Sequence, residues 1–223
     1  MLRASDGRAG RIVISSMFCI VPGFVSPGEG HAKKGGIGYD NGNEPGGAAM
    51  TSKYFAMLAR YNAWANCRLY EACEALTARE YMRQRASFFG SLHATLNHIL
   101  VVDRIWIARI ESQTPASLKL DQILYGDLIG LKVARLAEDE HIRIMLAGIA
   151  EEKLDRPVEY RNLRGDRCET LLCSVLGHFF NHQTHHRGQV HDMLSHTGVS
   201  PPSLDLIDFA RLEPAEATAE VSG

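Results

Sequence analysis

The sequence has no stretch of roughly 20 apolar residues, the length that a membrane-spanning helix requires. It also lacks any C-x-x-C pair, and its five cysteines, an odd number, are scattered along the chain. A membrane protein, a disulfide framework and a cysteine-based zinc site are therefore not expected. We interpret the cysteines as reduced thiols of a cytoplasmic protein; they are Cys19, Cys67, Cys73, Cys168 and Cys173.

No charge of one sign dominates, because 24 basic side chains face 26 acidic ones and the net charge is −2. Such a chain has no strong field to attract nucleic acid or an anionic membrane, so neither is an expected partner. The P-loop, the G-x-S-x-G elbow and the dinucleotide-binding fingerprint are missing as well. With 45% hydrophobic residues among 223, the composition is that of a globular protein with one domain, or one domain and a tail.

Residues 1–49 differ from the rest of the chain. Glycine, proline, serine and asparagine are frequent there, and such a segment buries too little apolar surface to offset its ordering entropy, so we predict that it is a disordered extension. The stretch Ile12–Val25 has the loose pattern of a signal peptide, but Pro22 interrupts it and no clean cleavage site follows. Because the patterned region opens at Met50, we hypothesise that Met50 rather than Met1 is the translation start.

Beyond residue 50 the apolar residues recur at steps of three and four, which predicts helices. Ser52, Ser87 and Asp127 are suitable N-caps, and Thr77 caps a short turn between the first two helices. The four predicted long helices span residues 52–76, 87–111, 127–150 and 169–196.

A different pattern precedes the last predicted helix. Val158 and Tyr160 alternate with polar residues, as do Cys168 and Thr170, and a Gly-containing turn separates the two segments, which predicts a short β-hairpin. Four long helices with short connections predict an all-α fold, a four-helix bundle over residues 50–210, followed by a C-terminal tail at 211–223.

Six of the ten histidines lie between residues 178 and 196, on the last predicted helix. His178, His182 and His186 share one face, since residues four apart are neighbours on a helix. Two such imidazoles can bind one metal ion, although a polar, histidine-rich face is the alternative. A third ligand would come from another helix, where His93 and His98 are available. A zincin mechanism is not expected, because Gln183 stands where that motif has its general base.

Three segments resemble the DinB family, within the wider superfamily of DinB/YfiT-like metalloenzymes. They are LARYNAWAN at Leu58–Asn66, FFGSLHATLNHILVVDRIW at Phe88–Trp106 and HFFNHQTHHRGQVH at His178–His191, and the last is the most specific. The resemblance extends from Tyr54 to Phe209.

The resemblance implies a four-helix bundle, often dimeric, that carries one divalent transition metal, with zinc and nickel foremost. One ligand comes from the second helix and two come from an H-x-x-x-H pair on the last. Carried over by position, the ligands are His98, His182 and His186, and all three are present. Three imidazoles leave a coordination position open for water or a small-molecule substrate.

Related enzymes use low-molecular-weight thiols such as mycothiol or bacillithiol, so the resemblance implies a thiol-dependent S-transferase or isomerase. A metal-dependent hydrolase and a non-catalytic metal-binding stress-response protein are the alternatives. A hydrolase would need a base, for which His185, His178 or Asp103 is available. The candidates for orienting the ligands or lining the pocket are His185, His178, Asn181, Asp103, Arg187 and Gln189.

Overall fold

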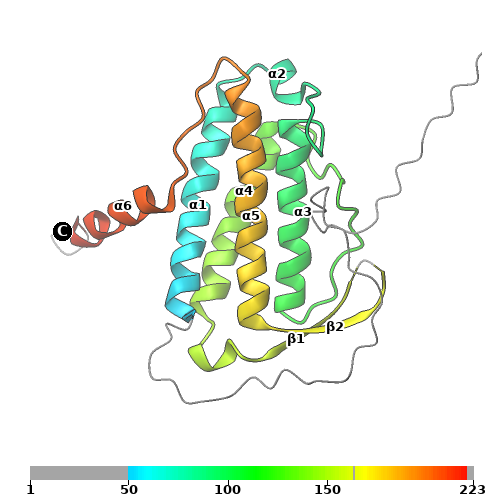
Figure 1. Cartoon of the computed structure of the whole chain (residues 1–223), viewed down its shortest axis with the longest axis vertical. Helices are drawn as coiled ribbons and strands as arrows, with labels where there is room; N and C mark the ends of the chain where they lie inside the picture. The colour runs from blue at the N-terminus through cyan, green and yellow to red at the C-terminus, as the bar shows by residue number, and fades with distance from the viewer. Residues whose placement is uncertain (1–49, 163, 220–223) are drawn as a thin grey trace, which may run out of the picture. The chain divides into compact units, whose positions relative to one another are not determined.

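The computed structural model describes residues 50–162 and 164–219, so the features predicted for residues 1–49 lie outside the described residues. Four long helices run side by side and form the bundle that the sequence predicts (Figure 1). The long helices are α1 (Ser52–Glu74), α3 (Leu92–Ile110), α4 (Leu128–Ala147) and α5 (Leu172–Ser195).

Besides a small cluster that joins α1 to Phe209, the apolar core has two larger clusters that follow one another along the bundle axis. One lies toward the hairpin and includes Phe55, Ile142 and Phe179, and the other lies toward the opposite end and includes Leu69 and Leu96. All four long helices contribute to both clusters. In α1, α4 and α5 the buried polar residues fall between the two clusters in the sequence of each helix, whereas in α3 only Asp103 does and His98 lies among residues of the second cluster. The bundle therefore has a polar middle level, and the candidate site lies there.

Helix caps explain where the long helices begin. The side chains of Thr51 and Asp127 accept hydrogen bonds from the backbone at the starts of α1 and α4, at 3.1 and 2.8 Å. The predicted start of the second long helix is wrong, because α3 begins after Ser91 rather than after Ser87. Gly90 has a φ of +78° and so interrupts the helical conformation between these two serines.

The predicted hairpin is present before the last helix. Strands β1 (Pro157–Arg161) and β2 (Arg167–Leu171) pair antiparallel, with Val158 opposite Thr170. A 3₁₀ turn, η1 (Glu151–Lys153), leads into β1 from α4.

Two further helices complete the described chain. The helix α2 (Ala78–Met82) forms at the turn that Thr77 caps. The helix α6 (Leu206–Ala219) was not predicted, and the expected boundary between residues 210 and 211 falls inside it. Phe209 attaches α6 to α1, because its ring centroid lies 5.9 Å from that of Tyr61. Within the described ranges, no helix is long and apolar enough to cross a membrane.

Candidate metal centre

Three imidazoles from two helices meet at the middle level of the bundle. His182 and His186 lie one turn apart on α5, with ring centroids 4.3 Å apart. The ring of His98, on the neighbouring α3, lies 5.2 Å from that of His182 and 4.5 Å from that of His186. One nitrogen of each ring lies within 4.8 Å of the other two, so the group could hold a metal ion.

The spacing of these nitrogens suits a tetrahedral ion. His98 Nε2 and His182 Nε2 are 3.3 Å apart, and two imidazole nitrogens bound to one tetrahedral zinc ion at 2.0–2.1 Å lie roughly 3.3 Å from each other. His186 Nε2 and His182 Nδ1 are buried and have no hydrogen-bond partner among the residues described. Within those same residues, no cysteine or carboxylate completes the group to four ligands.

Hydrogen bonds outside the cluster orient two of the rings. His98 Nδ1 lies 2.7 Å from the carbonyl oxygen of Leu120, and His186 Nδ1 lies 2.8 Å from Gln189 Oε1. Because both oxygens can only accept, each Nδ1 donates its proton, and the Nε2 lone pairs of His98 and His186 remain available to a metal. Gln189 Nε2 in turn lies 3.2 Å from His185 Nε2.

An aromatic ring closes one side of the cluster. Phe89 stacks on His98, with centroids 3.9 Å apart and planes inclined by 24°, and its edge approaches His186. Neither Phe89 nor the Leu120 carbonyl was predicted. Phe89 precedes α3, so helical spacing cannot predict that it lies beside His98. Every residue has a backbone carbonyl, so the identity of Leu120 does not indicate that its carbonyl binds His98. The one available signal in the sequence is the pair of apolar residues Phe88-Phe89 close to His98.

Burial keeps the three imidazoles neutral at pH 7. Desolvation, together with the neighbouring histidines, lowers the pKa of His182 to about 2. Desolvation also lowers the pKa of His186, to about 4, and that of His98. A neutral imidazole has the free lone pair that a metal needs, so the cluster is held in its ligating form.

The structure brings two other predicted pocket residues close to the cluster. His178 lies one turn before His182, with ring centroids 6.0 Å apart, and its ring centroid also lies 5.1 Å from that of Trp106. His185 is exposed, and its ring centroid lies 4.8 Å from that of His186. Asn181, by contrast, is exposed on α5. His93, the other histidine of α3, contacts the hydroxyl of Tyr81 at 3.2 Å instead.

Asp103 and Arg187, also predicted near the ligands, belong to a buried charge network. Asp103 accepts a hydrogen bond from Arg135, whose Nη2 lies 3.0 Å from Asp139 Oδ1. Arg187 donates to Asn62, which donates to the same Asp139 oxygen at 3.0 Å. Two arginines and two aspartates thus share the middle level with the histidines, and paired buried charges fix how the helices meet.

A helical bundle that places one histidine of α3 beside an H-x-x-x-H pair of α5 is a candidate metal-binding bundle. The model of the DinB family matches residues 50–219, and this chain belongs to that family. The chain is also 26% identical over 159 residues to Protein DinB of Bacillus subtilis (strain 168), a match that covers 69% of this chain and 92% of that protein.

Proposed function

We propose that this protein is a metal-dependent transferase that uses a small-molecule thiol, with one divalent metal, zinc or nickel, on His98, His182 and His186. The observation that carries the proposal is the number of ligands: the described chain offers three histidines and no fourth side chain. Structural zinc sites are closed by four protein ligands, whereas catalytic sites keep one position free. When bound, the metal would lower the pKa of a thiol or water and supply a nucleophile at neutral pH.

The thiol would come from the substrate. Cys73 is buried in the apolar cluster far along α1, and burial raises its pKa to about 12, so it is not a nucleophile at neutral pH. The other described cysteines, Cys67, Cys168 and Cys173, do not belong to the histidine group either.

His178 is the proposed proton acceptor. Burial and the nearby Arg109 lower its pKa, so its imidazole is neutral at pH 7 and can take the thiol proton. The sulfur then forms a bond to the electrophilic carbon, and the leaving group departs with the electron pair of the bond that breaks.

The test is turnover with purified protein loaded with zinc or with nickel. A panel of thiols is combined with model electrophiles, and the loss of free thiol is followed with and without the electrophile. We expect thiol-dependent turnover that His186→Ala abolishes and that His196→Ala, an exposed histidine of the same segment, leaves intact. Turnover of an ester without thiol would instead favour a hydrolase. Metal binding with neither activity would contradict an enzymatic function.

We also propose that the protein is a homodimer that pairs through α4. This helix exposes four large apolar side chains that recur at helical spacing, and Ile129 is 76% and Val133 64% exposed. The other two are Leu136 and Ile144. Exposed apolar side chains that gather on one helix face are typical of a protein interface, although Glu140 lies between Leu136 and Ile144 on this face. Sedimentation analysis should show a dimer that Val133→Glu converts to a monomer; a monomeric wild-type protein would contradict the proposal.

A further inference from the structure

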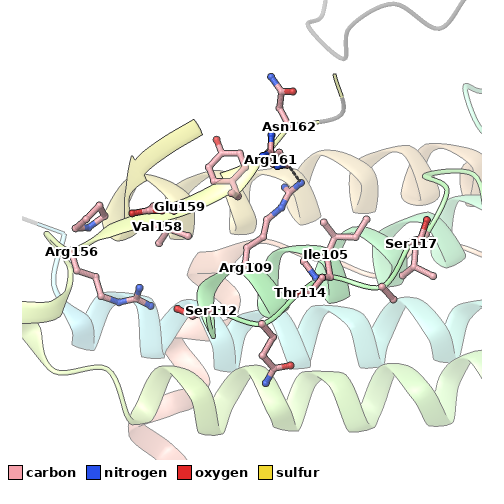
Figure 2. Close-up of a pocket in the computed structure, with 16 residues that line it drawn as sticks. Ile105, Arg109, Ser112, Thr114, Ser117, Arg156, Val158, Glu159, Arg161 and Asn162 are labelled. Carbon is pink, nitrogen blue, oxygen red and sulfur yellow. Dashed lines mark hydrogen bonds between the residues drawn. The ribbon is translucent and has the colours of Figure 1, made fainter. Parts of the chain in front are cut away.

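A cleft of about 810 Å³ opens between the end of α3, the segment Ser112–Leu118 that follows it, and the strand β1. In Figure 2, Arg109 extends from α3 toward Arg161 on the strand, and Arg156 lies where the strand begins. None of the three metal-centre histidines lines this cleft. It is therefore a second concave site, to which the proposed function gives no role.

The cleft has an excess of positive charge. Three arginines line it, Arg109, Arg156 and Arg161, and Glu159 is the one carboxylate among its lining residues. Within the described part of the chain, the ion pairs include none of these three arginines. An arginine that lacks a carboxylate partner retains both its charge and its ability to bind an oxyanion.

Backbone hydrogen bonds hold the three guanidinium groups in place. Each donates to a carbonyl oxygen: Arg109 to Arg161 at 2.8 Å, Arg156 to Ile110 at 2.6 Å, and Arg161 to Gly165 at 2.6 Å. A guanidinium has five N–H donors, so most of them remain free for a ligand. The positions are fixed while the binding capacity is kept, which lowers the entropy cost of binding an anion.

Arg109 is the most firmly positioned of the three. Its guanidinium lies 4.5 Å from the ring centroid of Trp106 and 4.8 Å from that of Tyr160. It is half-buried, and burial lowers its pKa, which shows that its charge is incompletely solvated. An oxyanion beside the Arg109 guanidinium would pair with its charge and so offset the free-energy cost of its lost solvation.

A series of ring contacts and one loop connect the cleft to the metal centre. Tyr160 lines the cleft, and its ring centroid lies 5.1 Å from that of Trp106, which lies 5.1 Å from that of His178; His178 in turn lies 6.0 Å from the ligand His182. The segment that lines the cleft ends at Leu118, and two residues later the carbonyl of Leu120 holds His98. The cleft and the metal centre are therefore neighbouring sites in the fold.

We propose that the cleft binds a carboxylate or phosphate group of the substrate, so that the molecule processed at the metal centre is an elongated organic anion. The statement that the bound anion is part of the substrate rests on the proposed function. The statement that the cleft binds an anion does not depend on the proposed function. Ser112, Thr114 and Ser117 also line the cleft, and their hydroxyl groups are further possible donors to the same oxyanion.

The first experiment measures anion binding alone on the full, zinc-loaded chain. In a Trp64→Phe background the fluorescence of Trp106 reports on the cleft, and inorganic phosphate or succinate is titrated at constant ionic strength. We expect saturation by at least one of the two anions, with affinity at least tenfold weaker in Arg161→Gln or Arg156→Gln. The matched control is Arg167→Gln, because Arg167 pairs with Arg161 across the hairpin but does not line the cleft.

Equal affinities in Arg161→Gln and Arg167→Gln, or no saturation by either anion, would overturn the anion site. Arg161 is exposed, so its substitution should leave the fold intact, and circular dichroism checks this. Which of the two anions saturates the site tells a carboxylate site from a phosphate site.

The second experiment links the cleft to turnover. Glutathione, which carries two carboxylates, is compared with cysteamine, which carries none. We expect Arg161→Gln to lower kcat/KM for glutathione at least tenfold and to leave that for cysteamine unchanged. If neither thiol is turned over while anion binding persists, the proposed function fails and the anion site stands. If both are turned over and Arg161→Gln affects neither, the link between cleft and substrate is overturned.

Discussion

His98 Nε2 and His182 Nε2 lie 3.3 Å apart, although the two residues belong to different helices and are separated by 84 positions in the chain. The Nδ1 proton of His98 is already donated to Leu120, so its Nε2 carries a lone pair that points at His182. Either a proton or a cation must lie between two such nitrogens. Burial depresses the pKa of both imidazoles, so neither ring is a cation at pH 7, and the two nitrogens can either share the ring proton of a neutral His182 or both bind a metal ion.

Metal removal and return should therefore change the stability of the protein. We expect one zinc ion per chain by calorimetric titration after chelation, and stabilisation against urea of about 2.7 kcal/mol when free metal is 100 times its Kd. His182→Ala should abolish both effects. His196→Ala should change neither, because His196 is exposed just past the end of α5. Equal zinc binding by the wild type and His182→Ala would contradict the assignment.

The ring of His186 should depend on Gln189 for its orientation. Removal of the acceptor in Gln189→Ala frees the imidazole to rotate, and we expect metal affinity to fall by about 10- to 100-fold. Gln189→Glu, which keeps an acceptor oxygen, should retain the affinity. Asn181→Ala is the control, as this exposed amide lies on the same helix. Competition with a fluorescent chelator gives the affinities, and equal losses in Gln189→Ala and Asn181→Ala would argue against the orienting role.

The relative positions of the candidate site residues could be predicted from the sequence where these residues share a helical face. The face shared by His182 and His186 follows from their spacing, and Gln189 falls on the same side, about 60° from His186 at about 100° per residue. Asp103 and Arg187 were grouped with the ligands by proximity in sequence alone. Asp103 lies five positions after His98, so its side chain is turned away from His98 by about 140° and joins the charge network.

Contacts between distant segments could not be predicted in this way. The hairpin and the long helices follow from local periodicity and turn residues, and so they were predicted with bounds within a few residues, except for the start of α3. The Leu120 carbonyl reaches His98 only because the loop after α3 folds back along that helix, where Asn97 Oδ1 accepts from the backbone of Leu124 and Tyr125 at 2.8 and 3.0 Å. Such a fold-back has no periodic signature, and the cleft of the three arginines depends on the start of the same loop.

The buried charge network should be costly to break. Arg135→Met leaves Asp103 and Asp139 as buried, unpaired carboxylates, so we expect a loss of about 3–5 kcal/mol in the free energy of unfolding. Arg143→Met is the control, because its ion pair with Glu140 is solvent-exposed and such pairs contribute about 0–1 kcal/mol. Urea denaturation of both variants tests the difference, and similar losses would refute a stabilising role for the pairing.

Acid should destabilise the metal-free protein. In the unfolded chain histidines bind protons below a pKa of about 6.5, whereas burial holds the pKa of His182 at about 2 and that of His186 at about 4. The unfolded state therefore binds more protons below pH 6.5, and stability is lost as the pH falls, with a slope of up to about 1.4 kcal/mol per pH unit for each histidine.

This slope can be measured from urea midpoints between pH 7.5 and 5. His182→Gln should make it shallower than in the wild type, whereas His196→Gln should leave it nearly unchanged, since His196 is exposed. Parallel pH profiles for the wild type and His182→Gln would show that the buried imidazole does not contribute to acid sensitivity.

The end of α3 offers a change that should stabilise the fold. Ser112 has a φ of +60°, and the amides of Ser112 and Gln113 donate to the carbonyls of Arg109 and Ala108 at 3.2 and 2.7 Å, which is the Schellman arrangement of a helix end. A side chain in this left-handed conformation costs roughly 1–2 kcal/mol that glycine avoids, although glycine loses about 0.5–1 kcal/mol more backbone entropy. Ser112→Gly should therefore raise the melting temperature by about 1–4 °C. Ser117→Gly, in the same loop but without a positive φ, should lower it or leave it unchanged, and a lower melting temperature for Ser112→Gly would contradict the strain at this helix end.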